Sequence, residues 1–302
     1  MTYSPVLLFV YSRVDNIKKS LESLSACEAS DMTDLFIFSD GPKNDLVKGN
    51  VDEVRKYIRK IKGFKSVSII ESTENKGLAN SIIGGVTQIF ERFNSIIVLE
   101  DDLVVSGNFL LFMNQALEYY ENRNEIISIS GYNMGVSNTY TEKYDVFFTQ
   151  RAASWGWATW KNKWENIDWE VKDFQELKKN RKLRKEFNKM GSDMYGMLKA
   201  QQEKRNNSWA IRYCYHQFRH NLLTVYPFIS KVKNIGFNDD ATHTNSRYNR
   251  FETNLEFDSK KEFSFAKSIS MNPRIIKEFR SKNGLRTRLK SKIINIILNL
   301  VR

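Results

Sequence analysis

An apolar stretch that ends in three consecutive carboxylates is the feature that most constrains this chain. Residues 96–99 form an uninterrupted aliphatic run of the kind found in strands buried on both faces of a parallel sheet. Glu100, Asp101 and Asp102 follow at once. Adjacent carboxylates repel one another and resist the loss of water, so such a cluster is stable mainly beside a cation or hydroxyl groups. A magnesium or manganese ion bound to a diphosphate would supply the cation, and we expect Asp102 to be its ligand.

The composition is that of a globular protein with one large α/β core or two modest ones. The chain has 302 residues, of which 41% are hydrophobic and 13% aromatic. Its two cysteines, Cys27 and Cys214, are too few for a disulfide framework and lack metal-binding spacing, which favours a reducing cytoplasm. The apolar stretch 6–11 is too short for a signal sequence or a membrane span, so we expect a first strand.

The positive charge is concentrated near the C-terminus. The net charge is +12, but residues 272–302 contain nine basic residues and one acidic residue, which leaves +4 for the rest. Leu285, Leu289 and Ile293 share one face of a predicted helix that is too short to span a bilayer, so we expect it to lie on an anionic membrane surface. A helix packed on the body is the alternative. Binding of nucleic acid through this tail is not expected, although the charge alone would allow it.

Strands and helices alternate in the first hundred residues, which predicts an α/β fold with a doubly wound, mostly parallel sheet. In such sheets ligands bind beyond the carboxyl ends of the strands, where polar residues of this chain follow the strands. The predicted strands are 6–11, 35–38, 67–70 and 96–99, and the predicted helices are 15–24, 51–61 and 78–93.

The pattern changes after residue 125 to short segments rich in Trp, Tyr and Asn. We predict a single domain over residues 1–266, with a Rossmann-like nucleotide half at 1–125 and an acceptor half at 126–266, followed by a basic amphipathic tail at 267–302. The charged stretch 172–189 is interpreted as a solvated helix or a lid.

Several short motifs occur in an order that resembles one enzyme family. They are Val10-Tyr11-Ser12-Arg13, Ser39-Asp40-Gly41, Asn75-Lys76-Gly77, Glu100-Asp101-Asp102-Leu103, Ser130-Gly131-Tyr132-Asn133, Gly156-Trp157, Ser208-Trp209 with Arg212, and Ile235-Gly236-Phe237 followed by His243. This order resembles that of GT-A glycosyltransferases with a DxD-type motif, especially the group that includes the N-acetylglucosaminyltransferase that starts complex N-glycans, and related bacterial sugar transferases. The resemblance covers roughly residues 4 to 250, and only the acidic motif is specific by itself.

The resemblance implies roles for residues at the strand ends. Arg13, Asp40 and Lys76 would hold the nucleotide, and Glu100 and Asp101 would lie near the ribose and the donor sugar. Asp102 would bind Mn²⁺ or Mg²⁺. Taken alone, each of two residues has a purely structural alternative. Arg13 could form a surface ion pair with Asp15, and Asp40 could form an Asx-turn before Gly41-Pro42.

The aromatic and basic residues of the second half are candidates for substrate contact. These candidates are Trp155, Trp157, Trp209 and Arg212. Indole rings can stack on sugar faces, but at least two of Trp155, Trp157 and Trp160 are expected in the core. His243 is a candidate second metal ligand or phosphate donor, with a purely structural role as its alternative.

The catalytic base is where this chain departs from the family. An inverting transfer needs a carboxylate to accept the proton of the attacking hydroxyl. The resembled enzyme carries acids before its Trp, whereas this chain has Asn207-Ser208, and an amide cannot act as that base. The candidates to replace it are Asp239, Asp240, Asp193 and Glu203, of which we favour Asp239 and Asp240 because their polar loop follows an apolar element.

These features predict a metal-dependent glycosyltransferase, of hexosyl or N-acetylhexosaminyl type. It would move a sugar from a nucleotide donor, expected to be UDP-linked, to a saccharide or polyprenyl-linked acceptor in polysaccharide biosynthesis at the cytoplasmic face of the membrane. A nucleotidyltransferase shares the acidic strand end, but its glycine-rich loop after the first strand is absent. A degenerate protein that binds sugar or nucleotide without turnover is a further alternative.

Overall fold

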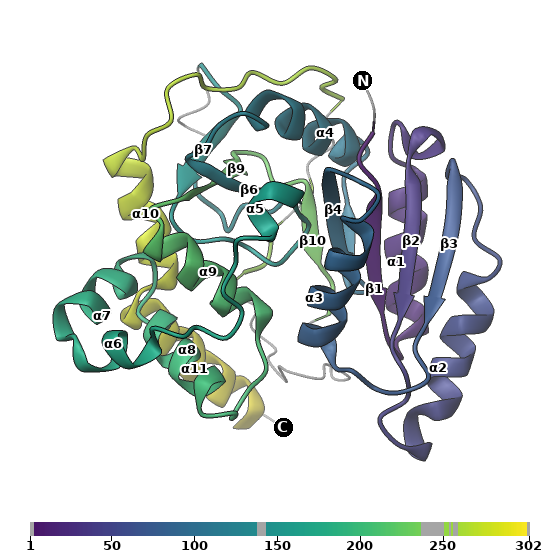
Figure 1. Cartoon of the computed structure of the whole chain (residues 1–302), viewed down its shortest axis with the longest axis horizontal. Coiled ribbons are helices and arrows are strands. Elements are labelled where there is room, and N and C mark those ends of the chain that lie inside the picture. Colours follow the sequence, from purple (N-terminus) through teal and green to yellow (C-terminus); the bar gives the residue numbers. More distant parts are fainter. Residues whose placement is uncertain (1–2, 138–142, 237–250, 254, 256–258, 301–302) are drawn as a thin grey trace.

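The structure is a computed structural model that describes residues 3–137, 143–236, 251–253, 255 and 259–300. Within these residues one eight-stranded sheet forms the centre of the molecule (Figure 1). The strands lie in the order β3 (Ser66–Glu71), β2 (Asp34–Ser39), β1 (Val6–Val10), β4 (Ser95–Glu100), β8 (Trp157–Trp160), β6 (Ile126–Ser130), β9 (Leu223–Pro227) and β7 (Val146–Thr149).

The first four strands in this order are parallel, so their carboxyl ends meet at one edge. Strand β8 then runs antiparallel to both β4 and β6, whereas β9 is parallel to β6 and β7 is antiparallel to β9. The predicted α/β class with a mostly parallel sheet is confirmed. The reversed strand β8 was not predicted.

Helices cover both faces of the sheet because its strands are apolar on both sides. Val6, Leu8 and Val10 of β1 belong to one core cluster, together with side chains of α1 (Val14–Ser25), α2 (Asp45–Ile58) and α4 (Phe109–Tyr120). Leu7 and Phe9 belong to a second cluster, with side chains of α3 (Leu78–Ile89) and α9 (Trp209–Arg219). Figure 1 shows α3 in front of the parallel strands and α1 behind them.

The predicted strands and helices of the first half agree with the structure, apart from small differences at their ends. The largest difference concerns α2, which begins at Asp45 instead of residue 51. The side chain of Asn44 accepts a hydrogen bond from the N–H of Val47 and so caps this helix. The apolar periodicity starts only later in the helix, which is why the pattern missed its first turn.

A small second sheet holds the segment that follows the acidic run. Strand β5 (Leu103–Val105) pairs antiparallel with β10 (Val232–Asn234), and Leu103 lies opposite Asn234 in the register. The segment that lies beside the acidic run is therefore about 130 residues further along the sequence.

The charged stretch 172–189 forms surface helices with one buried side. The stretch contains α6 (Phe174–Lys179) and α7 (Arg181–Phe187), and a 3₁₀ turn at Asn188–Met190 follows α7. Helix α5 (Lys161–Trp164) precedes the stretch and α8 (Met194–Gln202) follows it. Another 3₁₀ turn, at Ser30–Met32, lies in the first half of the chain. Phe174, Leu177 and Phe187 pack with α8 and α9 in a separate apolar cluster. The predicted helical character is therefore confirmed, and the stretch is a packed part of the body.

The predicted tail is divided between the body and the surface. Helix α10 (Pro273–Asn283) buries Ile275, Ile276 and Phe279, and the ring of Phe279 meets that of Tyr226 edge to face at 5.6 Å. The first helix of the predicted tail, α10, thus packs on the body, and its apolar face completes the core. Helix α11 (Leu285–Leu300) instead exposes six large apolar side chains among those that the structure describes, namely Leu285, Leu289, Ile293, Ile296, Ile297 and Leu298.

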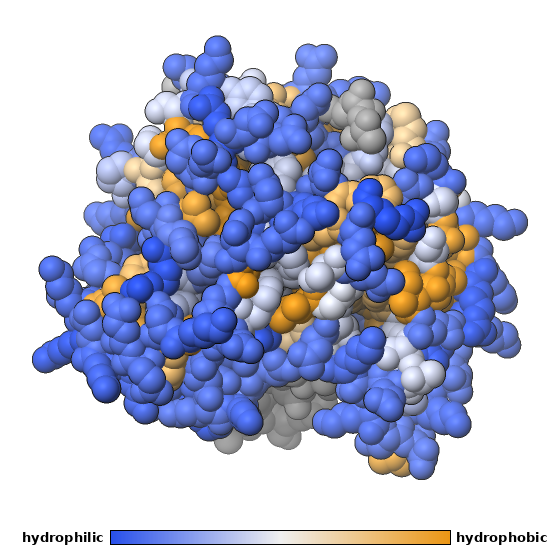
Figure 2. Space-filling model, in the orientation of Figure 1, coloured by the Kyte–Doolittle hydropathy of each residue, from blue (hydrophilic) through white to orange (hydrophobic). Residues whose placement is uncertain are grey.

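None of the helices in the described part of the chain is long and apolar enough to cross a bilayer. On the face viewed in Figure 1, hydrophilic side chains cover most of the surface and hydrophobic side chains form scattered patches between them (Figure 2).

Candidate functional site

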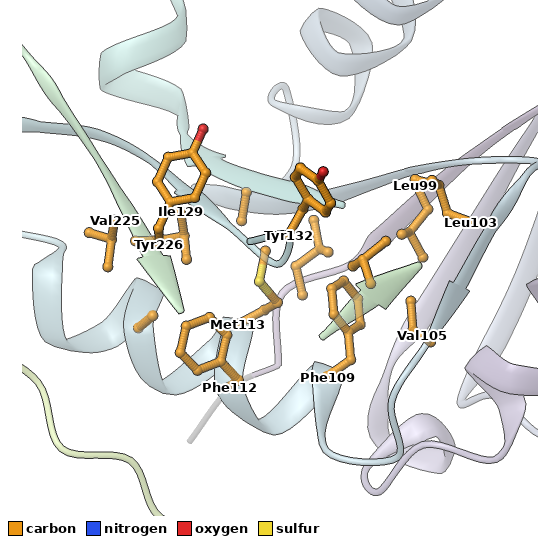
Figure 3. Close-up of a cluster of buried hydrophobic side chains, with 14 of the residues drawn as sticks. Leu99, Leu103, Val105, Phe109, Phe112, Met113, Ile129, Tyr132, Val225 and Tyr226 are labelled. Carbon is orange, nitrogen blue, oxygen red and sulfur yellow. The ribbon is translucent and has the colours of Figure 1, made fainter. Parts of the chain in front are cut away.

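The acidic run forms a tight turn between β4 and β5 that is anchored on both sides by leucines. Leu99 precedes the run and Leu103 follows it, and both are buried. Figure 3 shows these two side chains next to each other in the apolar cluster that also contains Phe109 of α4 and Tyr132. The apolar anchors therefore fix the position of three carboxylates that would be better hydrated elsewhere.

Arg13 joins the carboxylates from the neighbouring strand end. Its Nη2 lies 3.0 Å from Oδ1 of Asp101 and 3.0 Å from Oδ2 of Asp102. The N–H of Tyr11 donates to Oδ2 of Asp101 at 3.2 Å. These groups meet because β1 and β4 are parallel neighbours and end at the same edge. The structure thus brings Arg13 and the acidic run together, as the sequence predicts.

The run carries more negative charge than Arg13 neutralises. Burial raises the pKa of Glu100 well above its ordinary range, and the charges of Asp102 and Asp101 raise it further. Burial also raises the pKa of Asp101 to about 6, although the charge of Arg13 acts in the opposite direction. A further cation at this turn would therefore lower the electrostatic energy of the cluster.

Asp102 has the chemistry and exposure of a metal ligand. Its side chain is 16% exposed, compared with 9% for Asp101. Its Oδ1 is 3.4 Å from Nδ2 of Asn234, and its carbonyl oxygen accepts the N–H of Ile235 at 2.8 Å. A Mg²⁺ or Mn²⁺ ion needs one or two such carboxylates when phosphate oxygens complete its shell. Among the described residues no group of three or more His, Cys, Asp or Glu side chains is arranged around one ion.

Asp40 organises the turn that follows β2. Its Oδ1 accepts the N–H groups of Gly41 and Lys76, and its Oδ2 accepts the N–H of Gly77, each at 2.9 Å. The Asx-turn considered as an alternative for Asp40 is not formed, because the residue two positions on is Pro42, which has no N–H to donate. Asp40 and Lys76 do come together as predicted, but through the backbone of Lys76, whose side chain is exposed to solvent.

Two residues to which the sequence analysis gave no role, Arg55 and Tyr11, hold this part of the site. Arg55 of α2 donates to the carbonyl oxygens of Ser72 at 2.7 Å and Asp40 at 3.3 Å, which fastens the ends of β2 and β3. Tyr11 accepts the N–H of Lys43 on its hydroxyl at 3.1 Å. Because the backbone of Tyr11 also binds Asp101, this residue connects the Asp40 turn to the acidic run. Arg55 is one of several charged residues of α2, so nothing in the sequence indicated this role.

Trp157 and Trp209 are core residues, which corrects their assignment to substrate contact. They are 2% and 4% exposed, and their rings stack at 4.7 Å with an angle of 28°. Trp157 also stacks on Trp164 at 5.8 Å. Trp157 is thus stacked on two other indoles, and Trp209 is stacked on Trp157. Trp155 is half-buried and lines a cavity, so it remains a candidate for substrate contact.

Arg212 holds the loop before α9 in place. Its guanidinium donates to the carbonyl oxygens of Ser208 and Trp169 at 3.1 and 3.2 Å and to Oδ1 of Asn207 at 3.3 Å. Burial lowers the pKa of Arg212. Asn207, which stands where the resembled enzyme has an acid, is therefore a partner of Arg212.

The favoured base candidates Asp239 and Asp240, and the candidate ligand His243, lie outside the described residues. The two other base candidates are engaged in ion pairs. Asp193 binds Arg151 at 3.0 and 3.1 Å; burial alone would raise its pKa, but Arg151 outweighs burial and lowers it. Glu203 is on the surface, where a hydrogen bond from Arg205 lowers its pKa. A lowered pKa makes both groups weaker proton acceptors.

Another cavity, of about 210 Å³, is lined by His216 of α9 and by His220, which follows the last residue of that helix. The rings of His216 and His220 lie 4.3 Å apart, and His216 is 7% exposed. Burial, together with the neighbouring His220, lowers the pKa of His216 to about 4, although Asp168 acts in the opposite direction.

We expect this histidine to make the fold sensitive to mild acid. Because its pKa falls on folding from 6.5 to about 4, the unfolded chain binds the proton more tightly. The stabilisation is complete above pH 6.5 and is lost as the pH falls toward 4, with a limit of about 3 kcal/mol. Urea unfolding between pH 7 and 4 should show this loss, and His216→Gln should flatten it. If His216→Gln leaves the pH dependence unchanged while the exposed His220→Gln removes it, the assignment is wrong.

Comparisons with known proteins add little to this geometry. No protein-family profile and no curated protein sequence matches the chain. Among solved structures, the chain is similar to the mannosyltransferase PcManGT from Pyrobaculum calidifontis in complex with GDP-Man and Mn²⁺, with a TM-score of 0.36 and 13% identity. The match covers 53% of this chain and 46% of the mannosyltransferase, so the chain spans less than half of that protein. Similarity at this level carries no argument about function, which depends on the site itself.

Proposed function

We propose that the protein is a metal-dependent glycosyltransferase with a GT-A fold that uses a nucleotide-sugar donor. The observation that carries the proposal is the bridge from Arg13 to Asp101 and Asp102, formed where the parallel strands β1 and β4 end. This edge is the ligand-binding edge of doubly wound sheets. The excess negative charge of the acidic turn fits a divalent cation, and the order of motifs resembles that of the family.

In this proposal each group at the edge has a separate task. Asp102 holds the ion, which when bound would stabilise the negative charge of the departing diphosphate. Asp101 orients Arg13 toward the phosphates, and Glu100, whose pKa is raised by burial and by the neighbouring carboxylates, lies beside the donor sugar. The turn built by Asp40 contacts the base and ribose of the nucleotide, for which UDP is the proposed donor.

The acceptor chemistry is proposed from the resemblance. The transfer is inverting, with Asp239 or Asp240 accepting the proton of the acceptor hydroxyl and His243 assisting at the metal or phosphate. The acceptor is a saccharide or a polyprenyl-linked sugar of a cell-surface polysaccharide. A hexose or N-acetylhexosamine is the proposed transferred unit.

Nucleotide binding and turnover test this proposal separately. UDP with Mn²⁺ should raise the melting temperature more than UDP with EDTA, because ligands that bind only the folded state stabilise it. GDP serves as the alternative donor nucleotide. Slow UDP release from UDP-sugars in the presence of Mn²⁺ would demonstrate turnover, whereas binding without release would indicate a degenerate protein. Release of diphosphate from a nucleoside triphosphate would instead identify a nucleotidyltransferase, and failure of every nucleotide to bind would exclude the proposal.

Gly236→Ala is expected to weaken binding of the metal and nucleotide at least tenfold. A Cβ at position 236 would collide with the carboxylate of Asp102 and force it out of place. Isothermal titration of UDP in the presence of Mn²⁺ measures the effect. Gly84→Ala is the matched control, because a Cβ at this exposed site in α3 meets nothing within 4 Å and alanine favours the helix. Equal affinities of the two variants would contradict the placement of Asp102.

Membrane attachment through α11 is also proposed, at the cytoplasmic face of the membrane. The helix combines its exposed apolar side chains with Arg286, Arg288, Lys290 and Lys292. Vesicles with phosphatidylglycerol should bind the protein, and vesicles of phosphatidylcholine should not. Replacing Lys290 and Lys292 with alanine should weaken the free energy of binding to the anionic vesicles, measured by sedimentation, by about 2 kcal/mol. Salt-sensitive binding to RNA without binding to vesicles would contradict this proposal.

A further inference from the structure

A cavity of about 180 Å³ lies in the acceptor half of the molecule and has a largely apolar wall. It is lined by side chains of α8 and α9 and by the segments that precede β8 and follow β6. Its apolar lining includes Met134, Trp155, Met194, Met197, Ile211 and Phe251. Methionine side chains are flexible and polarisable, so a wall that contains three of them can adapt to a hydrocarbon chain.

One polar atom in this wall has no partner. Asn283, the last residue of α10, is fully buried and lines the cavity. Its Nδ2 donates to Sδ of Met134 at 3.0 Å and to the carbonyl oxygen of Phe279 at 3.4 Å, whereas its Oδ1 accepts no hydrogen bond. A buried acceptor without a donor costs about 1–3 kcal/mol. A ligand hydroxyl in the cavity would satisfy it.

The cavity shares its framework with the acidic turn. Trp155 of the wall is followed by Gly156, where an added Cβ would meet Leu99 at 3.4 Å and would collide with Val232. Leu99 anchors the acidic turn, and Val232 begins the strand that ends at Asn234 beside Asp102. The segment that carries Trp155 in the cavity wall therefore packs, through Gly156, on the residues that support the proposed metal site.

The cavity is also connected to the exposed helix α11. Asn283 is separated from the first residue of α11 by Gly284 alone. The carbonyl oxygen of Asn283 accepts the N–H of Ser192, and Arg288 of α11 donates to Oγ of the same serine at 3.2 Å. The wall of the cavity is thus continuous with the surface proposed to face anionic lipid.

We propose that this cavity binds the hydrocarbon next to the sugar of a lipid-linked acceptor, with one acceptor hydroxyl donating to Oδ1 of Asn283. The proposal rests on the glycosyltransferase function and narrows its acceptor to an amphiphile. Apolar contact supplies the affinity, because each buried methylene contributes about 0.8 kcal/mol. Asn283 supplies orientation, because its oxygen remains unpaired when the hydroxyl is absent or misplaced.

Binding of octyl β-glucoside and methyl β-glucoside to the full chain, at concentrations below micelle formation and with UDP and Mn²⁺ present, tests the proposal. We expect isothermal titration to show at least tenfold tighter binding of the octyl compound. Met197→Trp, which fills the cavity from a half-exposed position on α8, should remove this preference. Leu46→Trp adds the same ring at a site on α2 that is 90% exposed, and should keep it.

Each outcome has a separate meaning. Equal affinity for the two glucosides, or loss of the preference in Leu46→Trp as well, would overturn the proposal. So would displacement of octyl β-glucoside by N-acetyltryptophan amide at lower concentration, because that result indicates a peptide as occupant. The thermal shift with UDP and Mn²⁺, measured on the same samples, reports on the proposed function: its absence overturns the function, whereas its presence without an alkyl preference overturns only the amphiphilic acceptor.

Discussion

Asp102→Asn is expected to lower kcat/KM for sugar transfer by about 10³-fold, because a divalent ion contributes several kcal/mol to stabilising the leaving diphosphate. An amide has the size of the carboxylate but lacks its charge, so the ion would bind weakly. The turn itself should persist, since Leu99 and Leu103 anchor it and the carbonyl oxygen of residue 102 still accepts the N–H of Ile235.

The measurement is UDP release from the UDP-sugar that turns over, as a function of Mn²⁺ concentration. The variant should also require more Mn²⁺ for half-maximal rate. Asp34→Asn is the matched control, because Asp34 pairs with Lys65 at the start of β2, away from the carboxyl ends of the strands. A rate within threefold of the original at the same Mn²⁺ concentration would show that Asp102 does not hold the ion.

Arg13→Ala is expected to destabilise the fold by about 2–4 kcal/mol, because it leaves two poorly exposed carboxylates without the guanidinium that bridges them. The loss should be partly reversed by Mn²⁺, since the ion supplies positive charge at the same place. Mn²⁺ should therefore raise the melting temperature of this variant more than that of the original protein.

A double-mutant cycle isolates the electrostatic part of this effect. Combining Arg13→Ala with Asp102→Asn removes one of the orphaned charges, so the double variant should be more stable than the sum of the single effects predicts. Lys18→Ala removes an exposed ion pair with Asp15 on α1 and should cost less than about 1 kcal/mol. A loss for Arg13→Ala no larger than that of this control would contradict the bridging role.

The first half of the fold was predictable because its signals are local. Aliphatic runs marked β1, β2, β3 and β4, and the polar residues after them were expected at one edge. Parallel strands bring their carboxyl ends together whatever the loops contain, so the meeting of Arg13 with the acidic run followed from the strand pattern. The reversed strand β8 carries no such signal, because its direction depends on how the chain returns from β7.

The sequence by itself determined the alternating α/β pattern, the position of the acidic run at a strand end, and the concentration of charge in the last thirty residues. The tertiary structure alone decided which of several residues or helices of the same kind are buried in the core and which are exposed. Trp157 and Trp209 are stacked in the core while Trp155 lines a cavity, and α10 is packed against Tyr226 while α11 is exposed. The physical reason is that burial depends on contacts between segments far apart in the chain. The spacing of residues within one segment contains no information about these contacts.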